Sequence, residues 1–320
     1  MSLSHANSPE TKTYETVFAS ELALIHQYLE RWLGEEPVHP VQGPEILWKA
    51  LRYGTLLGGK RIRPLMTLLT SRLCGGLDEQ VLPTACAIEL VHAQSLIHDD
   101  LPCMDNDDLR RGQPTVHKAF DESTAVLAGD ALLAMAYGWI AQKTPLTNGS
   151  HEKLLRVISE FSRVTSIDGL VNGQFVDIYY EGKPFDAEVL HYIHTYKTGA
   201  LFTFSVKAGA ILANVPDPVL SRLTDLGNAL GLAFQIVDDL LDIESTPEAL
   251  GKTIGKDQVQ QKATYPSLFG VAQSRSKVKE LTAEANLALN DVCQHLNHLP
   301  SDTSVKAWQY LIEFLCHRIH

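Results

Sequence analysis

The sequence has few cysteines and no long apolar run, and both absences narrow the class of protein. No stretch is apolar over the length that a membrane span needs, and the polar N-terminus lacks the apolar core of a signal peptide. The cysteines are odd in number and widely spaced, which argues against a disulfide framework or a zinc site built on paired cysteines. A reducing, cytoplasmic location is therefore expected. The five residues are Cys74, Cys86, Cys103, Cys293 and Cys316.

Positive charge is also scarce. The 27 Lys and Arg residues against 38 Asp and Glu residues give a net charge of -11. A general nucleic-acid binder needs a basic surface that displaces counterions from phosphates, so no nucleic-acid partner is expected. An acidic chain that handles phosphorylated ligands would need metal cations to do so.

Nearly every periodic segment has a helical rhythm, and alternating strand patterns are absent. Residues 15–33, for example, place their apolar side chains on one broad stripe. Residues that typically begin helices stand ahead of later apolar runs: Asp186, Asp217 with a proline after it, and Ser301. The pattern therefore predicts helices separated by loops rich in Gly, Pro and Asn.

Two segments, residues 79–103 and 218–243, are apolar on most sides, which predicts helices at the centre of the fold. Segment lengths and ordinary helix size predict an all-α bundle of about ten or more helices. With 320 residues, 45% of them hydrophobic, the chain could form one large core or two tightly fused ones. No low-complexity linker separates two parts. We expect a flexible N-terminus over residues 1–14 and a single all-α domain over residues 15–320.

Acid-rich motifs, "DDLPCMD" and "DDLLD", lie at the ends of these two segments. A helix places residues three, four or seven apart on one face, so each motif forms an acidic rim on an apolar helix. Burying carboxylates there is costly unless cations neutralise them. Mg²⁺ is the natural candidate, because it binds through a few carboxylates and the oxygens of a substrate phosphate. The acids are Asp99, Asp100 and Asp105 in the first motif, and Asp238, Asp239 and Asp242 in the second.

Two other interpretations of these motifs compete with the magnesium site. A single motif of this kind is more often a solvated acidic turn than a metal site. Calcium is a rival ligand, but neither stretch has the spacing or the glycine of an EF-hand loop. The occurrence of two clusters, each at the end of an apolar helix, favours the magnesium site over both.

Cationic residues near the motifs predict a second way of holding phosphate. The stretch "LLGGKRIRP" puts Lys60, Arg61 and Arg63 in a glycine-broken loop ahead of a helix, where free N–H groups and arginine forks favour anions. Lys197 and Thr198 interrupt an otherwise apolar helix. A lysine there usually snorkels or forms an ion pair, but it could also point at a diphosphate. We expect one diphosphate to be held through Mg²⁺ and another directly by basic side chains.

The order of these motifs leads to a family. The chain carries, from its N-terminal to its C-terminal half, "GGKRIRP", "LIHDDLPCMDNDDLRRGQPTVHKAF", "LAGDALL", "NGQFVD", "YKTGALF", "GLAFQIVDDLLD" and "LGKTIGKD". With these motifs it closely resembles, from about Glu45 to its C-terminal region, the trans polyprenyl diphosphate synthases of the short-chain bacterial farnesyl and geranylgeranyl type.

The resemblance implies an isoprenoid synthase-type helical bundle around a central apolar shaft, usually a homodimer, with both acid motifs facing each other across its mouth. It implies the Mg²⁺-dependent head-to-tail condensation of isopentenyl diphosphate with dimethylallyl or geranyl diphosphate, with three Mg²⁺ ions when substrate is bound. Departure of the allylic diphosphate leaves a carbocation that the isopentenyl double bond attacks. No Ser, Cys or His nucleophile is needed.

Matching positions imply a role for each site residue. The Mg²⁺ ligands would be Asp99, Asp105 and Asp238, assisted by Asp100, Asp239 and Asp242. The residues central to catalysis would be Asp99, Asp100, Asp105, Lys197, Asp238 and Asp239. Isopentenyl diphosphate would be held by Lys60, Arg63, His92 and Arg111. The allylic diphosphate would be held by Arg110, Lys197, Thr198, Gln235 and Lys252.

Other polar residues of the motifs are interpreted as structural. His98 and Cys103 lie close to the first acids but need no catalytic role, so we expect them to be packing groups. Asp130 and Asp177 are expected to be buried acids satisfied by hydrogen bonds.

Product length should depend on the floor of the shaft. One isoprene unit is about as long as one helical turn, about 5 Å, so side chains about a turn below Asp99 would form that floor. The resemblance places Gln94 and Ser95 there, and the farnesyl-type pattern has an aromatic residue where this chain has Gln94. The Pro102–Cys103 pair is common to both types. We expect farnesyl diphosphate, with geranylgeranyl diphosphate as the alternative.

Two rivals come from other classes. A class I terpene cyclase would share the fold and the first motif, but its second motif usually has an Asn/Ser/Glu pattern, unlike "DDLLD". A non-catalytic partner subunit of a prenyl synthase should have lost acids or cations, and this chain retains them all.

Overall fold

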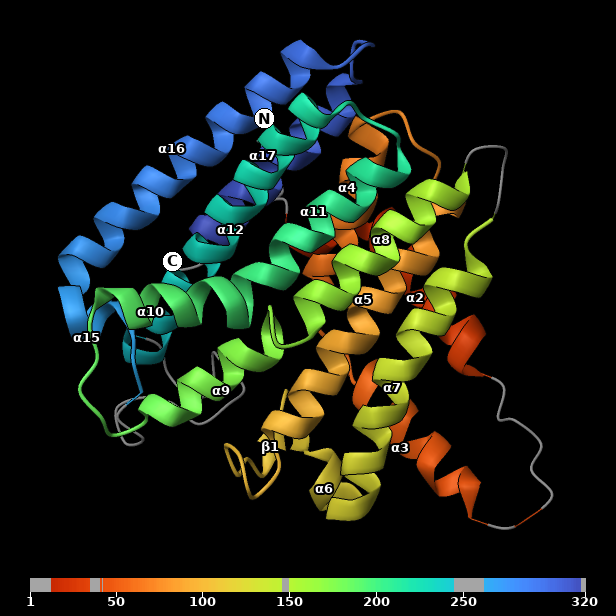
Figure 1. The fold of residues 1–320 in the computed structure, drawn as a ribbon, viewed down its shortest axis with the longest axis vertical. Helices are drawn as coiled ribbons and strands as arrows, with labels where there is room; N and C mark the ends of the chain where they lie inside the picture. Colours follow the sequence, from red (N-terminus) through yellow and green to blue (C-terminus); the bar gives the residue numbers. More distant parts are fainter. Residues whose placement is uncertain (1–12, 35–40, 42, 146–149, 245–261, 318–320) are drawn as a thin grey trace, which may run out of the picture.

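The computed structural model describes all residues except 1–12, 35–40, 42, 146–149, 245–261 and 318–320 (Figure 1). Most of the predicted flexible segment, residues 1–14, and the predicted diphosphate ligand Lys252 therefore lie outside the described residues. The division into this segment and one domain over residues 15–320 stays a prediction.

The expectation of an all-α bundle is confirmed. Among the described residues, the strands are confined to one antiparallel hairpin, made by β1 (Leu109–Arg110) and β2 (Gln113–Pro114). The helices of the N-terminal half are α1 (Tyr14–Val17), α2 (Ala19–Gly34), α3 (Pro44–Leu56), α4 (Ile62–Leu73), α5 (Asp78–Asp99), α6 (Val116–Ala119) and α7 (Glu122–Lys143). Those that follow are α8 (Ser150–Thr165), α9 (Leu170–Tyr180), α10 (Ala187–Ile193), the π-helix η1 (His194–Gly199), α11 (Ala200–Leu212), α12 (Asp217–Glu244), α15 (Tyr265–Phe269), α16 (Val271–His295) and α17 (Asp302–Cys316).

The helix starts follow the sequence signals. The Asp186 carboxylate accepts hydrogen bonds from the first N–H groups of α10, and the Ser301 hydroxyl caps α17 in the same way. Helix α12 begins at Asp217 itself. Helix α5 ends at Asp99, earlier than the predicted limit of residue 103, because the chain turns into a loop that contains Pro102.

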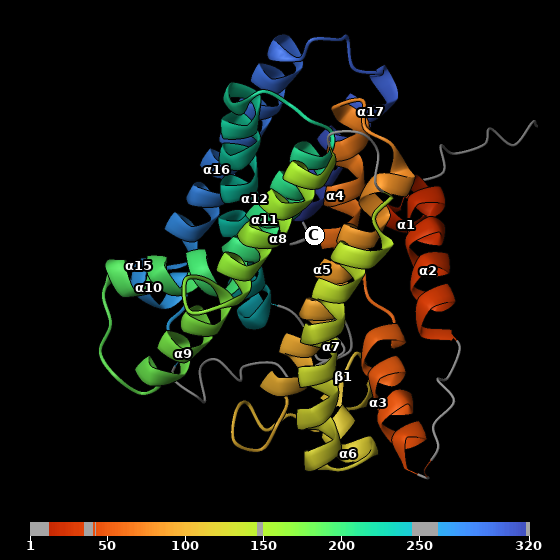
Figure 2. The ribbon, with the colours of Figure 1, turned by 45° about the vertical axis from the view of Figure 1, so that its right-hand side comes forward.

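Helices α5 and α12 lie at the centre of the bundle, as their apolar composition predicts. Helix α5 packs against α4, α7 and α11, and α12 packs against α11, α16 and η1. Their buried side chains belong to one main hydrophobic cluster that also takes in residues from α1 to α17. Figure 2 shows α2 and α3 along one side of α5, with α12 and α16 on the opposite side.

Both central helices end at the same end of the molecule. Figure 1 shows the last turns of α5 and α12 in its lower part, near β1 and α9. The two acid motifs, which occupy these helix ends, are thereby brought towards one another. This parallel arrangement is what converts two motifs far apart in sequence into one candidate site.

The segment η1 adds a third wall at this end. The segment η1 lies between α10 and α11 in the chain and has i→i+5 hydrogen bonds. Such π-segments in helices often lie at functional sites. Gly173 of α9 permits a close approach, since a Cβ there would lie 2.2 Å from the backbone N of Lys197. Helix α9 and η1 are therefore in direct backbone contact beside the acid motifs.

Helix α7 corrects one expectation. Among the described residues it is the one helix that is long and apolar enough, by length and composition, to cross a membrane. The expectation that no stretch is long and apolar enough for a membrane span is therefore wrong for α7, by length and composition. In the structure α7 packs along α5, α3 and α6, and the core helices of bundles commonly satisfy the same test.

Candidate active site

A cavity of about 210 Å³ lies between the ends of α5 and α12, η1 and the start of α15. Its lining combines carboxylates from both motifs with cations from three different segments. The structure thereby brings together most of the residues that the sequence assigned to catalysis and to the allylic substrate. Those that line the cavity are Asp99, Asp105, Arg110, Lys197, Thr198, Gln235, Asp238 and Asp239.

The first motif folds back on itself beyond the end of α5. The backbone N–H of Asp105 donates to the carbonyl of Asp99 at 2.8 Å, which brings the last acid of the motif beside the first. Burial raises the pKa of Asp99 to about 6, and the Asp105 carboxylate adds to the rise against the opposing charge of Lys197. Asp100 is buried and accepts hydrogen bonds from the guanidinium of Arg110.

Asp105 has a partner that the sequence analysis did not identify. The Nζ of Lys262 lies 2.8 Å from its Oδ1. Burial would raise the pKa of Asp105, but the charges of Lys262 and Lys197 outweigh it and hold that pKa below its usual range. Lys262 follows the second acid motif by twenty residues in a polar stretch, and no signal in a single sequence pointed to it.

In the second motif, Asp239 is held by several contacts. It accepts hydrogen bonds from the Gln235 amide at 2.9 Å and from the backbone N–H of Tyr265 at 2.9 Å. The Nε2 of the buried His194 lies 3.4 Å from its Oδ2. Asp242, one turn further on, is buried and lines a neighbouring cavity of about 660 Å³. The family resemblance predicts Gln235 and Asp239 as site residues, but not His194.

Lys197 and Thr198 project from η1 into the cavity. Lys197 donates to Asp177 at 2.5 Å, and the Thr198 hydroxyl donates to Gln235 at 2.6 Å. Burial alone would lower the pKa of Lys197, but the carboxylates of Asp177, Asp99 and Asp105 raise it well above its usual value. Lys197 therefore stays charged at physiological pH.

The residues assigned to isopentenyl diphosphate lie in a separate group. Burial lowers the pKa of Arg63 to about 10, and the charge of Arg111 adds to the effect. Burial and the charges of Arg63 and Arg111 hold the pKa of His92 well below its usual range. The Nε of Arg63 is buried with no hydrogen-bond partner among the described residues. Such a cluster has an excess of positive charge that an anion would relieve.

A glycine loop positions this cationic group. Gly58 and Gly59 have φ angles of +96° and +110°, and the Arg111 guanidinium donates to the Gly58 carbonyl. A Cβ at Gly59 would lie 2.5 Å from that guanidinium, so a larger residue there would displace Arg111 from the loop. Lys60 comes next in the chain and its Nζ lies 5.0 Å from the Phe314 ring centroid.

The adjacent arginines of "LRRG" reach different groups because a hairpin separates them. Arg110 ends β1 and turns to Asp100, whereas Arg111 stands in the turn with a φ of +55° and turns to the glycine loop. Gly112 follows with a φ of +76°, as in the two-residue turns that suit hairpins. One short hairpin therefore supplies Arg110 to the cavity and Arg111 to the glycine loop.

Arg61 differs from its neighbours in the basic loop. It is buried, with a φ of +50°, and forms an ion pair with the buried Glu89 at 2.5 Å. This buried ion pair therefore attaches the basic loop to α5. Asp177 is buried as expected, whereas the expectation of a buried Asp130 is wrong, because that residue is exposed on α7.

The two residues assigned to the floor lie on α5. Gln94 is half-buried and its amide contacts the ring of His98 at 3.1 Å, between Nε2 and Nδ1. The Ser95 hydroxyl donates to the carbonyl of His92 in its own helix at 3.0 Å. Neither residue lines the 210 Å³ cavity at the mouth.

The donor set fits Mg²⁺ only together with a further ligand. Among the described residues, no three His, Cys, Asp or Glu side chains converge closely enough to hold a metal ion by themselves. Mg²⁺ commonly binds through one or two carboxylates plus substrate phosphate oxygens, which matches acids divided between two sides of a mouth. The residues that would hold it are Asp99, Asp105 and Asp238, with Asp100, Asp239 and Asp242 behind them.

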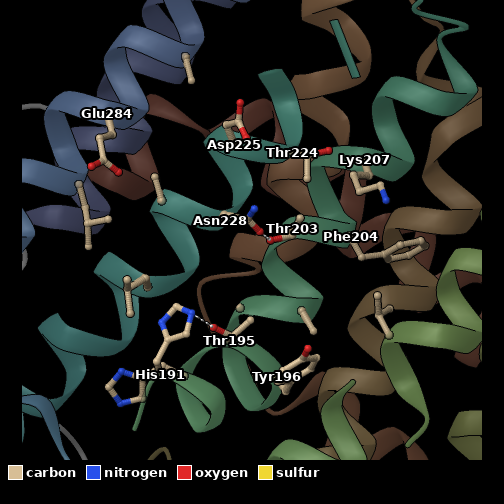
Figure 3. Close-up of a pocket in the computed structure, with 18 of the residues that line it drawn as sticks. His191, Thr195, Tyr196, Thr203, Phe204, Lys207, Thr224, Asp225, Asn228 and Glu284 are labelled. Carbon is tan, nitrogen blue, oxygen red and sulfur yellow. Dashed lines mark hydrogen bonds between the residues drawn. The ribbon is translucent and has the colours of Figure 1, made fainter. Parts of the chain in front are cut away.

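A larger cavity, of about 720 Å³, contains none of the predicted site residues. Figure 3 shows its lining, where Thr203 and Asn228 face each other across α11 and α12 and His191 contacts Thr195. Lys207 at its edge is paired with Glu160 at 2.8 Å. This cavity has no surplus charge that would suit a diphosphate.

Comparisons with known proteins identify the family of the chain. The polyprenyl synthetase family matches residues 44–298. A dimethylallyltranstransferase of Fischerella ambigua (strain UTEX 1903) is 47% identical over 247 residues, which are 77% of this chain and 71% of that protein. A chloroplastic geranylgeranyl pyrophosphate synthase of Catharanthus roseus is 47% identical over 246 residues, 77% of this chain and 68% of the relative.

A solved structure has the same fold. The geranyltransferase of Helicobacter pylori, in complex with magnesium and isoprenyl diphosphate, superposes with a TM-score of 0.80 at 28% identity, over 96% of this chain and 99% of that one. The chain belongs to the polyprenyl synthetase family and is a prenyltransferase with the isoprenoid synthase-type fold. The family and fold that the motifs predicted are confirmed.

Proposed function

We propose that the protein condenses isopentenyl diphosphate with allylic diphosphates in the presence of Mg²⁺ and releases geranylgeranyl diphosphate. The observation that carries the proposal is the division of charge around the mouth. Carboxylates of two motifs share the cavity with Lys197 and Arg110, while a second cationic group lies on the glycine loop. One diphosphate would bind through Mg²⁺ and the cavity residues, and the other would bind directly to the second cationic group.

The allylic diphosphate is assigned to the cavity. When its C–O bond breaks, the electron pair leaves with the diphosphate, and Lys197 and Arg110 would stabilise the growing negative charge. The Thr198 hydroxyl and the Gln235 amide would orient the leaving group. Mg²⁺ supplies further charge stabilisation on the diphosphate when it is bound. The apolar surroundings of α5 and α12 exclude water that would convert the carbocation to an alcohol.

Isopentenyl diphosphate is assigned to Lys60, Arg63, His92 and Arg111. Burial first, and neighbouring cations after it, lower the pKa values of Arg63, Arg111 and His92, so a bound anion would stabilise their charged forms. The double bond would supply the electron pair for the new carbon–carbon bond to the allylic cation. A proton then leaves the adjacent carbon for the released diphosphate, which restores a double bond and balances the charge.

The C20 product is favoured over the C15 product that the motifs suggested. The relative from Catharanthus roseus carries the name geranylgeranyl pyrophosphate synthase, and it matches 77% of this chain. No aromatic side chain stands at position 94, and the Gln94 amide is directed to His98 along α5. Farnesyl diphosphate is the second candidate, favoured by the fold shared with a geranyltransferase.

The test is an incubation of the purified protein with isopentenyl diphosphate, Mg²⁺ and one allylic primer at a time, followed by dephosphorylation and mass analysis. Geranylgeraniol as the main alcohol would support the proposal. Farnesol alone would replace it with the second candidate. If no alcohol longer than the primer forms under any combination, the elongation activity is wrong and a non-catalytic partner role takes its place.

The same experiment discriminates the remaining rivals. A class I terpene cyclase would release hydrocarbon or cyclic alcohol without consuming isopentenyl diphosphate. A partner subunit would elongate only when a second prenyl synthase chain is added. Asp99→Ala and Asp238→Ala should each abolish diphosphate release, and unchanged turnover in either would contradict the site assignment.

A homodimer is also proposed, from an apolar stripe on α9. Val171, Phe175 and Tyr179 stand four residues apart and are 52%, 63% and 53% exposed in the single chain. Light scattering should give twice the chain mass of 35.4 kDa, and Phe175→Lys should reduce it to one chain. A monomeric wild-type protein would contradict the proposal.

A cytoplasmic location is also proposed. The five cysteines are free thiols, which suits a reducing compartment.

A further inference from the structure

His98 has contacts that a simple packing residue does not need. Its ring lies between α5 and α7, with Nε2 3.0 Å from the carbonyl oxygen of Val126 and Nδ1 3.1 Å from Nε2 of Gln94. A backbone carbonyl can only accept a hydrogen bond, so Nε2 must carry the hydrogen. In the neutral ring Nδ1 is then the acceptor, and the Gln94 amide donates to it.

The ring is also fixed sterically. A Cβ at Gly129 would lie 2.0 Å from Nε2 of His98 and 2.4 Å from its Cδ2. The glycine of "LAGDALL" therefore forms a notch in α7 that the imidazole occupies. The notch and the Val126 carbonyl together fix His98 in one position, and His98 in turn fixes the amide of Gln94.

This arrangement determines where the Gln94 side chain points. His98 is one helical turn closer to Asp99 than Gln94 is, about 6 Å along the axis. The bond therefore draws the glutamine amide towards the mouth along the α7 side of α5. It also satisfies a polar group that would be costly to leave unpaired beside a growing hydrocarbon chain.

We propose that His98 is a positioning residue for product length: it holds Gln94 along α5, away from the floor of the shaft, and so keeps room for the fourth isoprene unit. The inference rests on the proposed function and on the assignment of Gln94 to the floor. Gly129 and the Val126 carbonyl are the parts of α7 that fix the position of His98.

The test is a double-mutant cycle read as the ratio of farnesol to geranylgeraniol at matched consumption of isopentenyl diphosphate. His98→Leu removes both hydrogen bonds, frees Gln94 and should raise the ratio at least about threefold. In a Gln94→Met background, which has no amide to hold, the same substitution should leave the ratio within about twofold. His98→Asn, whose amide oxygen can take the place of Nδ1, should restore the wild-type ratio. Equal effects in both backgrounds, or no effect in the first, would overturn the proposal.

A second pair of variants leaves α5 untouched, in case His98→Leu does not fold. Gly129→Ala pushes the ring out of its notch and should change the ratio in the same direction as His98→Leu. Gly138→Ala is the matched control on the same helix, because a Cβ there meets nothing within 4 Å. An unchanged ratio in Gly129→Ala would also overturn the proposal. If wild-type protein gives no elongated alcohol, the proposed function itself has failed, an outcome distinct from an unchanged ratio.

Discussion

The Nζ of Lys262 lies 2.8 Å from Oδ1 of Asp105, which joins the segment after the second acid motif to the first motif. Both side chains are largely buried, at 12% and 17% exposure, so the pair has little solvent screening. A cation from the segment just before α15 thus lines the mouth beside the first acid motif.

Replacing Lys262 should impair turnover. Lys262→Met removes a cation beside the assigned allylic site and leaves Asp105 with less compensation, so kcat should fall by about 100-fold, as for the loss of one preorganised charge-stabilising group. Lys262→Arg should retain most of the activity. Lys306→Met is the control, because Lys306 forms an exposed pair with Asp302 at 2.5 Å at the start of α17. Equal activity of Lys262→Met and Lys306→Met would contradict the prediction.

Removing the charge of Asp99 should stabilise the protein in the absence of metal and diphosphate. Its pKa is raised from 3.8 to about 6 by burial and by Asp105. Ionisation above that pH therefore costs the folded state up to about 3 kcal/mol that the unfolded chain does not bear. Asp99→Asn should raise the melting temperature at pH 7.5, in EDTA, by about 2–4 °C or more, and abolish turnover.

The sign of this effect fixes its pH dependence. The unfolded carboxyl ionises near pH 4 and the folded one near pH 6, so the penalty grows between these values and is complete above them. The advantage of Asp99→Asn should consequently vanish as the pH falls towards 4. A constant difference in melting temperature from pH 4 to 8 would show that Asp99 is not the titrating group.

His194 should act on the second motif through Asp239. Loss of its contact at 3.4 Å leaves the carboxylate to Gln235 and a backbone N–H alone, so His194→Leu should lower kcat by about 10- to 100-fold, as second-layer partners of metal ligands do. His191→Leu is the control, because His191 is an exposed histidine of the preceding helix α10, and its ring contacts Thr195. Comparable losses in the two variants would point to damage of the α10–η1 segment rather than of Asp239.

The glycine loop offers a test of the second cationic group. Gly59→Ala adds a methyl group where the Arg111 guanidinium lies and should raise the KM for isopentenyl diphosphate about tenfold, the worth of one charge-assisted hydrogen bond. Gly58→Ala is the control, because its Cβ meets nothing within 4 Å. Both variants should lose about 1–2 kcal/mol of stability from the positive φ angle. A raised KM in both would assign the effect to loop strain.

Motif spacing predicted most of the residues that line the site, but not the residues that contact and position them. Helical periodicity located α5 and α12, although α5 ends at Asp99 rather than at residue 103, and the order of the motifs identified most of the residues that line the mouth. Lys262 and His194 were missed, because their roles depend on tertiary contacts that no local pattern records. Asp130 was wrongly expected to be buried, since an acid inside an apolar run can equally mark the exposed side of its helix.

The orientation of Gln94, on which product length is proposed to depend, could not be predicted from the sequence either. The sequence identified Gln94 as a departure from the farnesyl-type pattern, but its orientation depends on His98 and on the space that Gly129 leaves in α7. Hydrogen bonds between helices decide such orientations. A sequence pattern of one helix cannot supply them.

The hairpin that separates Arg110 from Arg111 limits how this part of the chain can evolve. Surface loops ordinarily accept insertions, but Arg110 ends β1 and side chains in a strand alternate between faces, so one added residue in β1 would turn Arg110 away from Asp100. The candidate site would then lose the contact that positions one of its cations. Length variation among descendants of this gene should therefore collect in the other loops and spare residues 109–114.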